Sequence, residues 1–381
     1  MSRSTRRPVL ILALLAFALP ASAWSHKEHI QLTRLAAGRL MADPSTPADM
    51  KAWLKSITPQ VLTMDEERQY LMTARVGPFP RGVEGLPYWA TVPDLIAMTD
   101  GPGESGRKIQ PFDVPERMLH FVDCEYFNKD IERRRYRHDL SNKPKLYAFP
   151  TGLNDPHPDD KNYKPWAKAG MLPFRLEQCY AQLVENLRKK RLTDKPGQFP
   201  RDEHAARWAG YLAHYVQDNC QPHHSTEDYK SRAYFAEKRT APNVHWDMEG
   251  RLVDDDNNDY SELRSEFWTI FAKALDEVKD PIDTIDLRTA TIEVALISYD
   301  ALPTIGLAAM KAYEQGGAPE QPEGGVKGFD AAKFFHAKGK YLGRERTVLE
   351  IKAYQMAWSV KRVERLWLRA WEEAKAPVIE P

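Results

Sequence analysis

Residues 203–224 read EHAARWAGYLAHYVQDNCQPHH and carry the strongest local pattern in the chain. Apolar residues recur at helical spacing until Pro222, and a proline ends a helix because it lacks a backbone N–H. His214 and Asp218 are four residues apart on this predicted helix, so both side chains project from one face, about 5–6 Å apart at Cβ. An imidazole and a carboxylate at that separation can bind one metal ion, and His224 can fold back from the turn as a further ligand.

Further candidate metal ligands lie outside this helix. His245 and Glu249 form a second pair four residues apart, and two single candidates are His120 in the segment LHFVD and Asp94 in the segment WATVPD. Taken singly, each has a structural interpretation, because a lone His–Asp pair is usually a hydrogen bond and a lone buried histidine usually belongs to the core. Together, several nitrogen and oxygen ligands in a chain with few cysteines favour zinc.

The same periodicity predicts an all-α protein with one domain over 24–381. Loop composition marks residues 77–93, a surface insertion at 142–173 and a connection at 315–328 before the C-terminal helix. The sequence contains no alternating run long enough to indicate a sheet, and no internal repeat. Helical patterning is found at 28–40, from Pro93 onward, and at 174–190, 203–219, 262–278, 286–314 and 344–374.

The first 23 residues have the composition of a secretory signal. Three arginines among the first seven residues precede an apolar stretch from Val9 to Leu19, and Ala21-Ser22-Ala23 supplies small residues for cleavage. We therefore predict removal of residues 1–23 and a secreted or periplasmic protein. A membrane anchor is disfavoured because this stretch is short and no later segment approaches the about 20 apolar residues that a span requires.

Charge and cysteine content narrow the function further. Lys and Arg total 54, and Asp and Glu also total 54. The chain therefore lacks the excess of basic residues that is typical of proteins with an extended surface for duplex nucleic acid. The odd number of cysteines (Cys124, Cys179 and Cys220) allows one disulfide and leaves at least one thiol unpaired within the chain. None belongs to a CxxC pair, which argues against a zinc site built from thiolates.

These motifs resemble those of the superfamily of zinc-dependent bacterial phospholipases C and single-strand-specific nucleases of the S-one/P-one type. Proteins of that superfamily are helical, bind three zinc ions and use the N-terminal tryptophan of the mature chain as a ligand, through its amino group and carbonyl oxygen. Removal of residues 1–23 would expose Trp24 as the first residue. His29 matches the nuclease spacing Trp-x4-His, with His26 as a less favoured rival. The superfamily's His-x3-Asp-x5-His motif is matched by His214, Asp218 and His224.

The resemblance implies three sets of zinc ligands and the hydrolysis of a phosphate diester. Two acids gain catalytic roles: zinc ions that share Asp218 would lower the pKa of a water toward neutrality, and Asp94 would orient or deprotonate that water. The implied ligands are Asp94, His120, His214 and Asp218 for the first zinc; His224, His245 and Glu249 for the second; and Trp24 and His29 for the third, with Asp218 bridging it to the first.

Two departures from the superfamily pattern leave the substrate open. The nucleases carry an arginine three residues after the aspartate of the first zinc, where this chain has Ala97. The choline-binding phospholipases carry a tyrosine directly after that aspartate and a phenylalanine three residues before the histidine, where this chain has Leu95 and Arg117. Arg117, Arg107 or Lys108 could supply the missing positive charge near a phosphate.

Three functions follow from the resemblance. Asp123 stands where the nucleases use an aspartate to hold a base edge, with Phe121 nearby as a stacking surface, although the phospholipases also carry an aspartate there. The Trp-x4-His spacing and the segment LHFVD favour cleavage of single-stranded nucleic acid. Glu249, where the nucleases usually have aspartate, and the last helix favour a phospholipase C that acts on phospholipid head groups. The third hypothesis is a zinc-stabilised binding module without turnover. None of the three requires an obligate protein partner.

Overall fold

The computed structural model describes residues 24–73, 82–99, 108–109, 114–127, 170–193, 203–235, 242–255, 259–313 and 329–375. The predicted signal segment 1–23 and the loop at 315–328 lie outside these ranges, as does all but the end of the predicted insertion at 142–173. The described chain is mostly helical, so the predicted all-α class is confirmed. The strands form two short antiparallel pairs, β1 with β2 and β3 with β4.

The bounds of the helices and strands follow chain order. They are α1 His26–Ala42, α2 Ala48–Ile57, α3 Met64–Met72, α4 Leu86–Trp89, α5 Val92–Thr99, β1 Lys108–Ile109, β2 Val114–Pro115, η1 Glu116–Leu119, η2 Cys124–Phe127, α6 Leu172–Thr193, α7 Glu203–Asn219, η6 Pro222–Ser225, η7 Arg232–Tyr234, α8 Val244–Met248, α9 Arg251–Asp254, α10 Ser261–Glu277, α11 Leu287–Tyr299, α12 Leu302–Tyr313, α13 Ala331–Phe335, β3 Lys338–Tyr341, β4 Arg344–Thr347 and α14 Val348–Glu373. The η elements are 3-10 helices.

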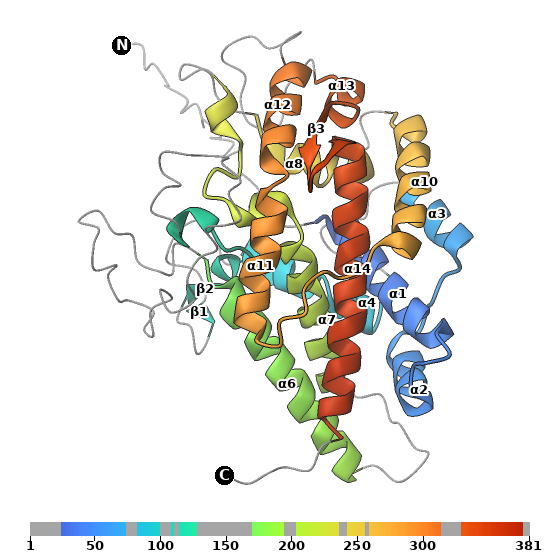
Figure 1. Cartoon of the computed structure of the whole chain (residues 1–381). Coiled ribbons are helices and arrows are strands. Elements are labelled where there is room, and N and C mark those ends of the chain that lie inside the picture. Colours follow the sequence, from blue (N-terminus) through green and yellow to red (C-terminus); the bar gives the residue numbers. More distant parts are fainter. Residues whose placement is uncertain are drawn as a thin grey trace, which may run out of the picture.

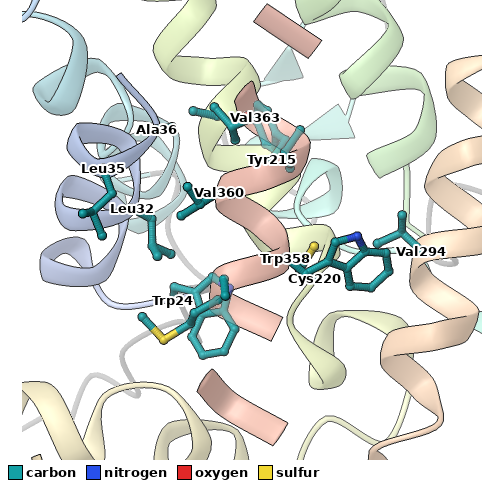
Figure 2. Packing of buried hydrophobic residues seen from close by; sticks show 14 of the residues in the cluster. Trp24, Leu32, Leu35, Ala36, Tyr215, Cys220, Val294, Trp358, Val360 and Val363 are labelled. Carbon is teal, nitrogen blue, oxygen red and sulfur yellow. The ribbon is translucent and has the colours of Figure 1, made fainter. Parts of the chain in front are cut away.

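The C-terminal helix α14 organises the core. In Figure 1 it runs down the middle of the molecule in red, and it packs against α1, α6, α7 and α10. Figure 2 shows Trp24, Leu32 and Val360 in the apolar layer where α1 meets α14. Trp367 and Trp371, near the C-terminal end of α14, are also buried, and the ring centroid of Trp371 lies 5.3 Å from that of Trp53 in α2. Burial of such large side chains is the main force that stabilises these helices against one another.

The helix predicted over 286–314 is interrupted. Helix α11 ends at Tyr299 and α12 begins at Leu302, with Pro303 in the first turn of α12. A proline there cannot donate to the carbonyl of residue 299, and its ring clashes with that carbonyl, so the continuous helix breaks one turn earlier. The prediction recognised the apolar period of both halves and overlooked this break.

The apolar stretch Leu287–Tyr313 corrects one expectation about membranes. It is long and apolar enough, by length and composition alone, to cross a bilayer, with a mean hydropathy of 1.4 over its best window. The structure buries 67% of that window, and α11 packs against α6 and η6. Most of its apolar side chains are therefore packed in the protein core.

The last predicted helix begins later than expected. Residues 344–347 form β4, which pairs with β3 through a two-residue turn at Leu342 and Gly343, both with positive φ. Thr347 then begins α14 with a capping box, in which its side chain accepts from Glu350 N and its own N–H donates to the Glu350 carboxylate. The Thr-x-x-Glu pattern at 347–350 is the signal that marks this start.

The three cysteines are buried and free. Cys124, Cys179 and Cys220 lie in the packed core and none is in a disulfide. Burial raises the pKa of the Cys179 thiol to about 12, so this group stays protonated and unreactive at neutral pH. The disulfide that the sequence allowed is not formed.

Candidate metal centre

Four side chains from three distant parts of the chain meet at one point. His214 and Asp218 come from the last turns of α7, Asp94 from the first turn of α5, and His120 directly follows η1. Asp218 Oδ2 lies 2.9 Å from His120 Nδ1 and 3.2 Å from His214 Nε2. The two nitrogens are 3.1 Å apart. Asp94 Oδ1 lies 3.7 Å from each nitrogen.

The distances between these four ligand atoms are close to those between ligand atoms around a single zinc ion. Zinc binds imidazole nitrogen and carboxylate oxygen at about 2.0–2.2 Å, which in tetrahedral geometry places two ligand atoms roughly 3.3 Å apart. The distances among His120 Nδ1, His214 Nε2 and Asp218 Oδ2 lie just below that value, between 2.9 and 3.2 Å, and those from Asp94 Oδ1 to the two nitrogens lie just above it, at 3.7 Å. The predicted ligands of the first zinc therefore converge.

Asp218 also faces a second group of side chains. Its other oxygen, Oδ1, lies 3.4 Å from His29 Nε2, on α1. The two oxygens of Asp94 also face different groups. Oδ1 faces His120 and His214, whereas Oδ2 lies 3.8 Å from His29 Nε2 and 3.7 Å from His26 Nε2. His26, the less favoured rival in the sequence, thus lies at the same site. Asp94 and Asp218 thus each direct one oxygen to a histidine on α1 and the other to His120 and His214, as a carboxylate shared by two metal ions would.

A separate cluster contains His224, His245 and Glu249. His224 is in η6, His245 is in α8, and Glu249 caps the C-terminus of α8. Glu249 Oε1 lies 3.5 Å from His224 Nε2 and also contacts His245 Nε2. The three ligand atoms lie within 4.8 Å of one another, and all three residues are buried. These residues are the predicted ligands of the second zinc.

The hydrogen bonds of three histidines orient their Nε2 atoms toward the acids. The Nδ1 atom of His29 lies 2.5 Å from Gln217 Oε1, that of His214 lies 2.7 Å from Ala90 O, and that of His224 lies 2.7 Å from His120 O. Each partner is an oxygen acceptor, so Nδ1 carries the proton and the Nε2 lone pair faces inward. A hydrogen bond of this kind fixes the tautomer of a metal-binding histidine.

Glu249 is held in a comparable way. Gln221 Nε2 donates to Glu249 Oε1 at 2.7 Å, and Gln221 Oε1 accepts from the backbone N–H groups of His223 and His224. Gln217 and Gln221 are four residues apart in the HYVQDNCQPHH motif. Neither glutamine had a predicted role, although their spacing beside Asp218 and His224 is the signal that could have identified them.

Burial sets the protonation of the acids and histidines. It raises the pKa of Asp94 to about 7, with the neighbouring Asp218 adding to the effect and His214 opposing it. Burial likewise raises the pKa of Asp218 and of Glu249 well above the ordinary range. It lowers the pKa of His29, His120 and His245, and brings that of His224 to about 4. The low dielectric disfavours every charged form, and a cation among these groups would favour ionised acids and neutral imidazoles.

The centre contains several buried polar atoms that have no hydrogen bond within the described chain. These include His29 Nε2, Asp94 Oδ2, Asp218 Oδ1 and His224 Nε2. Such atoms are costly in an apolar interior unless another partner satisfies them. Neutral imidazole nitrogens and carboxylate oxygens at these spacings can hold metal ions, and as donors they suit zinc.

Trp24 lies beside the centre. It is fully buried directly before the capping box of α1, and its indole Nε1 donates to Gln217 O at 2.8 Å. Gln217 precedes Asp218, so Trp24 approaches the segment that carries Asp218. Its predicted role as a ligand, through a free amino group and carbonyl oxygen, stays a prediction.

The predicted substrate contacts lie around His120. Arg117 is half-buried in η1, Phe121 is half-buried and Asp123 is buried. Gly170 has a φ of +88° and passes so close to Phe121 that an added Cβ would lie 2.0 Å from its carbonyl oxygen. The start of α6 therefore packs directly against this segment. Arg107 lies outside the described residues, and the roles of Arg117, Phe121 and Asp123 stay predictions.

A charged network that the sequence analysis missed supports His120 and His214. The rings of both histidines pack against Tyr215, whose hydroxyl donates to Glu116. Glu116 Oε1 also accepts from Arg175 at 3.3 Å. Because these partners come from α6, α7 and η1, the network orients the two rings only when those elements are packed together.

Comparison of the chain with protein families, with curated proteins and with solved structures finds no match.

Proposed function

We propose that this chain is an exported zinc-dependent phosphodiesterase of the phospholipase C and S-one/P-one nuclease type, with single-stranded nucleic acid as its substrate. One observation carries the proposal: Asp94, His120, His214 and Asp218 place four ligand atoms around one point, and the opposite carboxylate oxygens face His29. With the His224–His245–Glu249 cluster, this arrangement supports about three zinc ions.

The proposed residue roles follow from this placement. Asp218 would join the first and third sites, and His224, His245 and Glu249 would hold the second. Bound zinc supplies Lewis acidity, which polarises a phosphoryl oxygen and allows water to act as a nucleophile near neutral pH. Asp94 would bind metal and would also orient that water and accept its proton, because its Oδ1 faces His120 and His214 while its Oδ2 faces His29.

Glu249 supports a second candidate, a phospholipase C. The phospholipases carry glutamate at this position, and here its carboxylate accepts from Gln221 while contacting both histidines of the cluster. Ala97 weakens the nuclease, because α5 lacks the arginine that the nucleases place one turn after the first aspartate, and Leu95 and Arg117 depart from the phospholipase pattern as well. Phospholipid is therefore the alternative substrate.

One experiment separates these functions. Protein whose N-terminus is confirmed as Trp24 is purified, its zinc content is measured, and it is incubated with single-stranded DNA, RNA and phosphatidylcholine vesicles. We expect two to three zinc ions per chain and release of acid-soluble nucleotides that stops after chelation and returns with added zinc. Release of diacylglycerol instead would identify the phospholipase. If the protein binds zinc and hydrolyses none of these substrates, the proposal is overturned and the remaining hypothesis is a zinc-stabilised binding module.

A further inference from the structure

A fully buried lysine lies next to the metal centre. Lys352, on α14, has no exposed surface, and its Nζ donates to Glu28 Oε1 at 2.6 Å, to Met248 O at 2.8 Å and to Glu249 O at 2.9 Å. The same Nζ lies 4.5 Å from the centroid of the Trp24 ring, a cation–π distance. One ammonium group thus contacts both the first residue of the predicted mature chain and the backbone of a candidate zinc ligand.

Glu28 extends this contact to the start of α1. While its Oε1 accepts from Lys352, its Oε2 accepts from the backbone N–H of Ser25 at 2.9 Å. The Ser25 hydroxyl in turn accepts from Glu28 N, which completes the capping box. Because Ser25 directly follows Trp24, the position of the Trp24 main chain depends on where Glu28 is held.

Stability alone is a weak explanation for this pair. Desolvation of two buried charges offsets much of their attraction, and replacing such a pair by apolar side chains of similar volume is often neutral or stabilising. The Lys352–Glu28 pair is fully buried and is hydrogen-bonded to main-chain groups beside two predicted zinc sites. The placement of the pair therefore points to a role in the geometry of the centre.

We propose that Lys352 is a positioning residue that couples the two ends of the zinc cluster, by holding the Trp24–Ser25 backbone and the Glu249 backbone at a fixed separation. This inference rests on the proposed zinc centre and names a residue in the last helix that governs it. Without the ammonium group, Glu28 and the carbonyl oxygens of Met248 and Glu249 lose a shared donor. The backbone at Glu249 and the turn at Ser25 can then move independently.

The chain contains a matched control. Lys27 is also fully buried, and its Nζ also donates to three backbone carbonyls: Leu71 at 3.0 Å, Thr73 at 2.7 Å and Val253 at 3.3 Å. None of these three acceptors belongs to a predicted ligand: Leu71 lies in α3, Thr73 follows α3, and Val253 lies in α9. Lys352→Met and Lys27→Met therefore remove the same group from similarly buried surroundings, and Lys352→Met also removes a hydrogen bond to the backbone of the predicted ligand Glu249.

The test measures zinc per chain and the chelator concentration that removes half of it, with thermal unfolding recorded in parallel. We expect Lys352→Met to lose one zinc equivalent or to weaken retention at least about 10-fold, within the 10–100-fold range for residues that orient metal ligands. Lys27→Met should lower Tm while keeping the wild-type zinc content and chelator midpoint. Cobalt substitution should show an altered visible spectrum in Lys352→Met alone.

Glu28→Gln keeps the test decisive if Lys352→Met does not fold. It preserves the shape of the side chain and removes the charge that Lys352 meets, so a smaller loss of zinc of the same kind is expected. Unchanged zinc content, chelator midpoint and cobalt spectrum in the folded variants would overturn the inference. A wild-type protein that binds no zinc would overturn the proposed function instead, so the two failures are distinguishable.

Discussion

Asp218 Oδ2 lies 2.9 Å from His120 Nδ1, although the two residues are 98 positions apart in the chain. Neither side chain is exposed enough for water to satisfy it, and Asp218 directs its other oxygen to His29 at 3.4 Å. A carboxylate that faces imidazoles on both sides is the arrangement expected of a ligand shared by two metal ions.

Asp218→Asn should remove the bridge and keep the side-chain volume. A neutral amide is a poor zinc ligand, so we expect the loss of at least one zinc equivalent and a fall in kcat of more than about 100-fold, beyond the 10–100-fold range for residues that only support the ligands. Zinc analysis and a diesterase assay on the same preparation measure both effects. Full zinc content with full activity would show that Asp218 holds no metal.

Gln217→Leu should disturb the centre indirectly. Gln217 Oε1 accepts from His29 Nδ1 at 2.5 Å, and without this acceptor the His29 ring loses its fixed tautomer and orientation. We expect zinc retention to fall about 10-fold or more. Gln355→Leu is a suitable control, because Gln355 is also buried and donates to Tyr341 instead of supporting a predicted ligand. Equal zinc retention in the two variants would contradict this role.

The stabilisation that zinc confers should increase with pH. The pKa of Asp94 is raised from 3.8 to about 7, so the metal-free fold gains stability from its protonated carboxyl at low pH and loses that stability as pH rises through about 7. The pKa of His224 is lowered from 6.5 to about 4, so its neutral form stabilises the fold above pH 6.5, and this contribution is lost as pH falls toward 4.

Zinc therefore competes with a proton on Asp94 across the neutral range, whereas His224 is already neutral there. We expect the difference in Tm between zinc-loaded and chelated protein to grow from about pH 5 to pH 8. At saturation, with zinc 1,000-fold above its Kd, one site contributes about 4 kcal/mol. In Asp94→Asn the growth with pH should be smaller, and the part that remains comes from Asp218 and Glu249, whose pKa burial also raises. A difference that is constant with pH in the wild-type protein would argue against Asp94 as a ligand.

Ala97→Arg tests the substrate. Ala97 is half-buried in α5, one turn after Asp94, at the position where the nucleases that this chain resembles carry an arginine for the phosphate. A guanidinium group there would stabilise the charge of the transition state, so we expect the rate on single-stranded DNA to increase by about 10-fold. Ala97→Gln provides similar length without the charge. If Ala97→Arg raises the rate only on phosphatidylcholine, or if both variants hydrolyse single-stranded DNA at equal rates, the proposed nuclease activity is contradicted.

The sequence alone determined the helical class and the local pairs of candidate ligands. Helical periodicity and caps are properties of neighbouring residues, so the bounds of α7 were predicted to the residue and those of α10 to within one. The i,i+4 geometry likewise placed His214 with Asp218, and His245 with Glu249, before any tertiary contact was known. Local signals that the prediction overlooked were Pro303 within the 286–314 helix and the Thr347 capping box.

Tertiary structure alone decided which of these groups meet. Asp94, His120 and His214 converge because α5, η1 and α7 pack together, and no periodicity within one element specifies that packing. The supporting contacts are equally non-local: Gln217 orients a histidine 188 positions away, and Lys352 reaches Glu28 across 324 positions. Burial then shifts the pKa of the acids and histidines, because desolvation depends on the whole packed core rather than on neighbours in the chain.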